Sequence, residues 1–152
     1  MLKRLFLGLL LVGVAGCAQG RSEKPLRVLF IGNSYTYVND LPGTIGHLAS
    51  AAGFQLESVE ECPGGFTLKK HWESGKDQPL LLGSHFDWVV MQDQSQEPSF
   101  TVGQLRRDMY PYVRQLQTVA TQVGTRPILF MTWGHQNGDP VNVPGDTFQN
   151  MN

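Results

Sequence analysis

One segment constrains the fold more than any other, the stretch from Leu26 to Tyr37, which reads Leu-Arg-Val-Leu-Phe-Ile-Gly-Asn-Ser-Tyr-Thr-Tyr. Its first six residues are mostly apolar or β-branched and a Gly follows them, which predicts a buried strand that ends in a tight turn. Ligands of open α/β sheets bind just beyond the carboxyl ends of the strands. Ser34, in the Gly-Asn-Ser turn, therefore stands where such a sheet presents a nucleophile, and the backbone N–H groups of the turn point toward whatever approaches it.

Two longer segments have the periodicity of helices. Apolar residues recur at helical spacing over 41–52, after Asp40 and Pro42, which suit the start of a helix. A second apolar stripe covers 101–123, where Pro111 is expected to kink the helix or divide it in two.

Strands are predicted at Leu26–Ile31 and over residues 54–61, 86–92 and 127–133. The second of these alternates apolar and polar residues, as expected for a more exposed strand, and the other three have the composition of interior strands. A strand, a helix and another strand form a right-handed βαβ unit. The alternation of strands and helices therefore predicts an α/β fold, a three-layer α/β/α sandwich on a parallel sheet.

Polar or glycine-rich residues follow each of the later predicted strands, at the same edge of the sheet as Ser34. Gly64 and Gly65 come after the second strand, and the run Gln92-Asp93-Gln94-Ser95-Gln96 closes the third. A Gly-rich loop with His135 follows the fourth. Each segment is also typical of an ordinary turn or loop, so the argument for a site rests on their common register.

Together these segments resemble the sequence blocks of the SGNH (GDSL-like) hydrolases, and Phe-Ile-Gly-Asn-Ser-Tyr-Thr is most similar to a largely uncharacterised bacterial branch. The resemblance implies that Ser34 is the acylated nucleophile of an esterase-type hydrolase. It also implies an oxyanion hole made by the Ser34 N–H, the Gly65 N–H and the side-chain amide of Gln94. Gln94 stands where the family usually has Asn, and keeps the amide donor on an arm one methylene longer.

Five further residues are candidates for lining the pocket: Asn33, Tyr35, His71, Trp72 and His135. His71 and Trp72 follow the Gly-Gly turn and could instead belong to a loop packed on the domain. His135 is the histidine placed at the carboxyl end of a predicted strand.

The general base is not evident in the sequence. SGNH hydrolases supply it from Asp-x-x-His near the carboxyl terminus, and no Asp in this chain is followed by His at that spacing. We therefore expect a domain that is truncated before its last strand-helix unit and has low activity. The resemblance implies a flavodoxin-like order of strands in its sheet. His135 as a substitute base is one alternative, and a non-catalytic lipoprotein that binds a glycan or an acyl group in the same cleft is another.

The amino terminus has the pattern of a bacterial lipoprotein signal. Residues 1–16 contain Lys3 and Arg4 before an apolar run too short for an ordinary transmembrane helix, and the run ends in Val-Ala-Gly-Cys. This resembles a lipobox in which Cys17 is lipidated. We expect a lipid-anchored tether over 17–25, a hydrolase domain over 26–152, and attachment to the outer face of an inner membrane or to an outer membrane.

Charge and cysteine content narrow the possible partners. Removal of residues 1–16 takes away two of the 12 Lys and Arg residues and none of the 13 Asp and Glu residues, so the formal charge falls from −1 to −3. The chain contains no run of basic residues of the kind that binds nucleic acid, so nucleic acid is not an expected partner. Only Cys62 would accompany Cys17, which excludes an intramolecular disulfide in the domain, and no ligand spacing predicts zinc, so we expect neither a metal nor another cofactor. A small-molecule or polysaccharide ester is the expected substrate.

Overall fold

A computed structural model of the chain describes residues 24–133 and residue 145. Four parallel strands form one sheet in the order β2-β1-β3-β4. Their bounds are β1 Leu26–Ile31, β2 Leu56–Glu61, β3 Trp88–Met91 and β4 Arg126–Leu129. This is the flavodoxin-like order, with β1 in the interior of the sheet. The predicted α/β fold class is confirmed.

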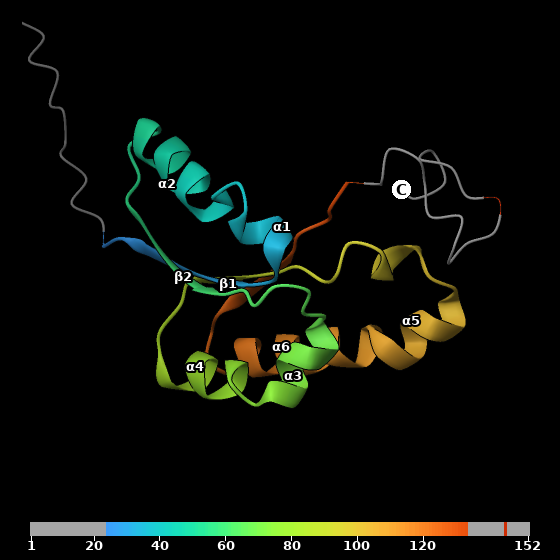
Figure 1. The fold of residues 1–152 in the computed structure, drawn as a ribbon. Coiled ribbons are helices and arrows are strands. Elements are labelled where there is room, and N and C mark those ends of the chain that lie inside the picture. Colours follow the sequence, from blue (N-terminus) through green and yellow to red (C-terminus); the bar gives the residue numbers. More distant parts are fainter. Residues whose placement is uncertain (1–23, 134–144, 146–152) are drawn as a thin grey trace, which may run out of the picture.

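Helices cover both faces of the sheet (Figure 1). On one face lie α1 (Ser34–Tyr37) and α2 (Leu41–Ala51). On the other lie α3 (Leu68–Ser74), α4 (Asp77–Gly83) and α6 (Tyr110–Gln122). A short 3-10 turn, η1 (Glu97–Ser99), and α5 (Val102–Asp108) lie beyond the carboxyl end of β3. The predicted three layers are therefore present.

The main core lies between the sheet and the helices α3, α4 and α6. Its buried members come from β1, β3, these helices and the segment just before β3: Leu29, Ile31, Leu68, Leu81, Phe86, Val89, Met91, Leu116 and Ala120. Val28 and Phe30 are also buried and alternate with Leu29 and Ile31 along β1, so they face α1 and α2. Burial on both faces explains why β1 is a continuous apolar run. In the described part of the chain, no helix is long and apolar enough to cross a bilayer.

The two predicted helical segments form for the expected reasons. The Asp40 carboxylate accepts a hydrogen bond from the Gly43 N–H at 3.0 Å and caps α2, whose first turn contains Pro42. The segment 101–123 is divided into α5 and α6, with Pro111 in the first turn of α6, where its missing N–H has no partner to lose.

The sequence analysis missed α3 and α4. Thr67 is a sequence signal that could have revealed α3, because its hydroxyl caps the helix by accepting from the Lys70 N–H at 3.1 Å. Gly75 then ends α3 in the left-handed region, at φ +70°. Each helix has only seven residues, which is too short for a clear apolar stripe.

Candidate active site

Ser34 is the first residue of α1 and follows the carboxyl end of β1 by only two residues. Asn33 caps this helix: its Oδ1 accepts from the Tyr35 N–H at 3.1 Å. The Ser34 side chain is half-buried. Its backbone N–H donates to no group within the described residues, as is usual at the first turn of a helix. The turn therefore offers a hydroxyl and a free N–H donor at the same place.

Asn33 links the loops that follow β1, β2 and β3, which the sequence analysis placed at one edge of the sheet. Its Nδ2 donates to the carbonyl of Phe66 at 2.8 Å, in the loop after β2, and to the carbonyl of Asp93 at 3.4 Å, in the loop after β3. The Asn33 side chain is 2% exposed, so these hydrogen bonds are shielded from water. Asn33 therefore holds the loops of Gly65 and Gln94 beside Ser34, from beneath the surface.

Gly65 lies in a turn that requires glycine. The Phe66 N–H donates to the Pro63 carbonyl at 3.2 Å, and Gly65 has φ +68°, which L side chains rarely adopt. The residue is exposed, and no atom lies within 4 Å of the position a Cβ would occupy. Its N–H donates to no described residue. The turn thus leaves both a donor and open space for a substrate.

Gln94 and Asp93 order the loop after β3. The Gln94 Oε1 accepts from the Gln96 N–H at 2.7 Å, which leaves its Nε2 without a partner in the described part of the chain. Asp93 Oδ1 accepts from the N–H groups of Leu68 and Gln94, at 3.0 and 2.8 Å, and links this loop to the start of α3. Burial raises the pKa of Asp93 above its ordinary value, although these two hydrogen bonds oppose the shift.

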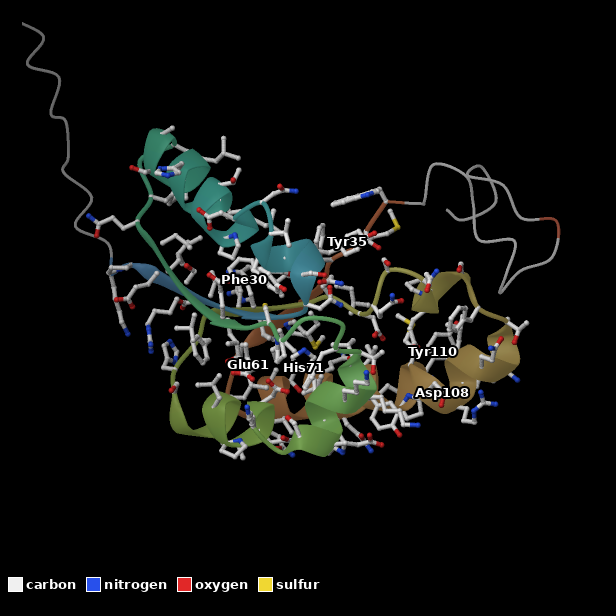
Figure 2. All side chains as sticks on the ribbon, viewed as in Figure 1. Phe30, Tyr35, Glu61, His71, Asp108 and Tyr110 are labelled. Carbon is white, nitrogen blue, oxygen red and sulfur yellow. The ribbon has the colours of Figure 1, made fainter. Side chains whose placement is uncertain are left out.

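A pocket of about 200 Å³ opens beside the nucleophile candidate. Its lining residues are Ser34, Tyr35, Val38, Asn39 and Trp133. The Tyr35 and Trp133 rings lie 4.9 Å apart at an angle of 42°, and Figure 2 shows Tyr35 on the α1 side of the sheet. None of the five side chains is charged at neutral pH, so the pocket suits an uncharged ligand.

Comparison with solved structures shows what this arrangement is similar to. One match is a candidate SGNH hydrolase from Slackia heliotrinireducens, 25% identical, with a TM-score of 0.69 over 84% of this chain and 68% of that one. A second is TesA, 16% identical, with a TM-score of 0.55 over 82% of this chain and 66% of that one. The chain thus spans about two thirds of the length of each. No protein-family profile and no curated protein matches the sequence.

This is an SGNH-type fold. The structural neighbours support the superfamily that the sequence resembles. The expected truncation and the lipoprotein signal are not tested by them.

The structure separates the pocket candidates. Tyr35 lines the pocket, whereas Asn33 lies beneath it. His71 does not line it: the side chain is fully buried on the α3 side of the sheet, where Figure 2 also shows it. Trp72 packs against the core from α3. Neither residue lines the pocket, because the unpredicted helix α3 buries His71 fully and leaves Trp72 partly buried against the core.

Other predicted residues cannot be placed. His135 and Cys17, with the signal segment 1–16 and the tether up to residue 23, lie outside the described residues. Within the residues that the structure describes, no three His, Cys, Asp or Glu side chains gather as metal ligands would.

Three residues help to build the site although the sequence analysis gave them no role in it: Trp133, Asp93 and Gln92. Trp133 closes the pocket from the segment that follows β4. Gln92 is 1% exposed, and its Oε1 accepts from the Asn33 N–H and from the Thr36 hydroxyl, at 3.1 and 3.0 Å. Their roles have no local sequence signal, because Gln92 bonds Asn33 and Thr36, and Asp93 bonds Leu68, across long stretches of the chain.

Proposed function

We propose that this chain belongs to a serine hydrolase of esterase type, in which Ser34 is acylated by the substrate. One observation carries the proposal: Ser34 stands at the end of an interior strand, beside a pocket, with unpartnered donors on neighbouring loops. The SGNH hydrolase neighbours support the same class of activity.

The donors suggest how the reaction is stabilised. Attack of the Ser34 Oγ on an ester carbonyl forms a bond to carbon and moves an electron pair onto the carbonyl oxygen, which becomes an oxyanion. The N–H groups of Ser34 and Gly65 and the Gln94 Nε2 are free to donate to that oxygen. Collapse of the intermediate expels the alcohol, which takes the proton that the base removed from Ser34.

The base is the missing part of this scheme. In the described residues no histidine lines the pocket beside Ser34, and the chain contains no Asp-x-x-His. We propose that an Asp-x-x-His in a longer form of the protein supplies it, with His135 as the alternative within this chain. The two structural neighbours are each about half as long again as the region that matches this chain, which supports a base supplied by a longer form.

The pocket favours an uncharged substrate. Its aromatic and polar lining carries no charge, and an exposed Trp beside a Tyr offers flat apolar faces of the kind that sugar rings stack on. We therefore propose O-acylated polysaccharide as the substrate class.

We also propose that the protein is anchored at the cell envelope through Cys17. If so, Cys17→Ser releases the protein from membranes.

A fluorophosphonate probe tests the proposal directly. The probe phosphonylates an activated serine hydroxyl, so we expect labelling of the wild-type chain at Ser34 and none in Ser34→Ala. Ser22→Ala, in the segment before the domain, is the matched control and should label normally. His135→Ala distinguishes the two bases: loss of labelling favours His135, and retained labelling favours a base elsewhere. Absence of labelling in this chain and also in a longer form that carries Asp-x-x-His would favour the non-catalytic binding protein instead.

A further inference from the structure

The peptide unit between Gly32 and Asn33, directly before Ser34, is hydrogen-bonded on both sides to buried side chains. Its carbonyl oxygen accepts from His71 Nε2 at 2.8 Å, and its N–H donates to Gln92 Oε1 at 3.1 Å. His71 comes from α3 and Gln92 from the end of β3. Both are fully or almost fully buried, at 0% and 1% exposure. The orientation of this peptide is therefore set by two distant elements and not by the turn alone.

The Gly32 carbonyl determines the protonation of His71. A carbonyl oxygen can only accept, so Nε2 must carry a hydrogen. The other ring nitrogen, Nδ1, lies 3.1 Å from Asp77 Oδ2, and a hydrogen bond there needs one further proton between the two groups. Asp77 is also fully buried, at the start of α4. The ring is thus bonded at both ends, which fixes its plane.

The surroundings of His71 favour placing that proton on the ring. The charged groups that face it are all acidic: Asp77 from α4, Glu61 from the end of β2 and Asp93 from the loop after β3. Burial by itself lowers the pKa of His71, but the hydrogen bonds to Asp77 and Gly32 and the charges of Asp77 and Glu61 outweigh it, so the pKa is raised. The contact is then an imidazolium–carboxylate pair inside the protein. Figure 2 shows Glu61 and His71 on the same side of the sheet.

We propose that His71, oriented by Asp77, and Gln92 are positioning residues that clamp the Gly32–Asn33 peptide and so fix the hydroxyl and N–H of Ser34. The catalytic consequence rests on the proposed function, whereas the clamp itself does not. Gln92 also connects the peptide to α1, because its Oε1 accepts a hydrogen bond from the Thr36 hydroxyl in the first turn of that helix. An oxyanion donor acts only where its N–H meets the developing charge, and a displacement of about 1 Å can cost about a hundredfold in rate.

The clamp can be observed without any activity. In the 152-residue chain labelled with nitrogen-15 and carbon-13, we expect both ring nitrogens of His71 to be protonated at pH 6. We also expect a scalar coupling across the hydrogen bond from Nε2 to the Gly32 carbonyl carbon. His71→Leu should shift the amide signals of Asn33 and Ser34, and the matched control His47→Leu, at an exposed position of α2, should not. Absence of the coupling, or unmoved amides in His71→Leu, would overturn the clamp.

The catalytic consequence is measured as the rate of fluorophosphonate labelling at Ser34, well below the unfolding temperature of each variant. We expect His71→Leu to slow labelling about tenfold to a hundredfold, whereas a merely structural role would lower the unfolding temperature and leave the rate of the folded protein unchanged. Asp77→Asn should retain more of the rate than Asp77→Leu, because the new amide can donate to Nδ1 while a neutral ring still donates from Nε2 to Gly32. If His71→Leu does not fold, the two Asp77 variants decide, and equal rates in them would refute the positioning role.

The two proposals fail in different ways. A protein that shows the coupling but no labelling, in a longer form with Asp-x-x-His as well as in this chain, would refute the proposed function and leave the clamp standing. A wild-type chain that labels, with His71→Leu labelling at the same rate, would refute the positioning role of His71 in the reaction and leave the proposed function standing.

Discussion

Replacement of Gly32 by alanine tests whether the nucleophile turn is as tightly packed as the contacts indicate. A Cβ at this position would lie 2.5 Å from Thr36 Oγ1 and 2.9 Å from Gln92 Oε1. Side-chain ends can often move aside, but these two are hydrogen-bonded to each other at 3.0 Å and are only 2% and 1% exposed. Making room for the methyl group therefore means breaking that bond or moving the backbone of the turn.

The cost can be built from these two contributions. Overpacking of a close-packed interior costs about 1–3 kcal/mol, and loss of a buried hydrogen bond adds about 1 kcal/mol. We expect Gly32→Ala to lower the free energy of unfolding by about 2–4 kcal/mol. For a domain of this size that corresponds to a fall of about 8–16 °C in melting temperature, taking about 4 °C for each kcal/mol.

Gly46→Ala is the matched control, because its Cβ would meet no atom within 4 Å and Gly46 lies inside α2. Alanine is favoured over glycine in a helix interior by about 0.5–1 kcal/mol, so this variant should be stabilised. Thermal unfolding followed by circular dichroism measures both variants on the same scale. If Gly32→Ala melted at or above the wild-type temperature, the argument that Thr36 and Gln92 are locked together would be refuted.

Two further predictions concern Glu97 and the core. Burial, followed by the charges of Asp93 and Asp108, raises the pKa of Glu97 from 4.5 to about 7, so the folded state holds a proton that the unfolded state releases. The stability associated with this proton is complete below about pH 4.5 and is lost as the pH rises through about 7. Glu97→Gln should therefore raise the melting temperature at pH 8 and not at pH 4. An equal change in melting temperature at both pH values would contradict this prediction. Leu116→Ala, at a fully buried position of α6, should cost about 2–5 kcal/mol in urea unfolding, whereas Leu48→Ala, at a side chain 67% exposed, should change stability by less than about 0.5 kcal/mol.

The sequence determined those parts of the fold whose signal is local. The apolar run of β1 requires burial on both faces, and the capped, periodic segment of α2 requires a helix, whatever surrounds them. The division at Pro111 has the same origin, because proline lacks the N–H that a continuous helix would need. Strand ends were less well determined: the fourth strand was expected over 127–133 and is observed at Arg126–Leu129. A strand ends where the neighbouring strand no longer pairs with it, and the sequence of the strand itself does not show where that is.

The tertiary structure decided which side chains surround Ser34. The sequence placed Ser34 after an interior strand, since that depends on neighbouring residues alone. The partners of the turn are 39 residues away for His71 and 59 for Gln92, and no pattern in the chain links them. His71 was a pocket candidate, with packing on the domain as the alternative, and it is fully buried because a seven-residue helix, too short to show in the sequence, turns it inward. A hydrogen bond between distant segments forms only once the sheet and helices have packed, so its residues acquire their roles from the fold.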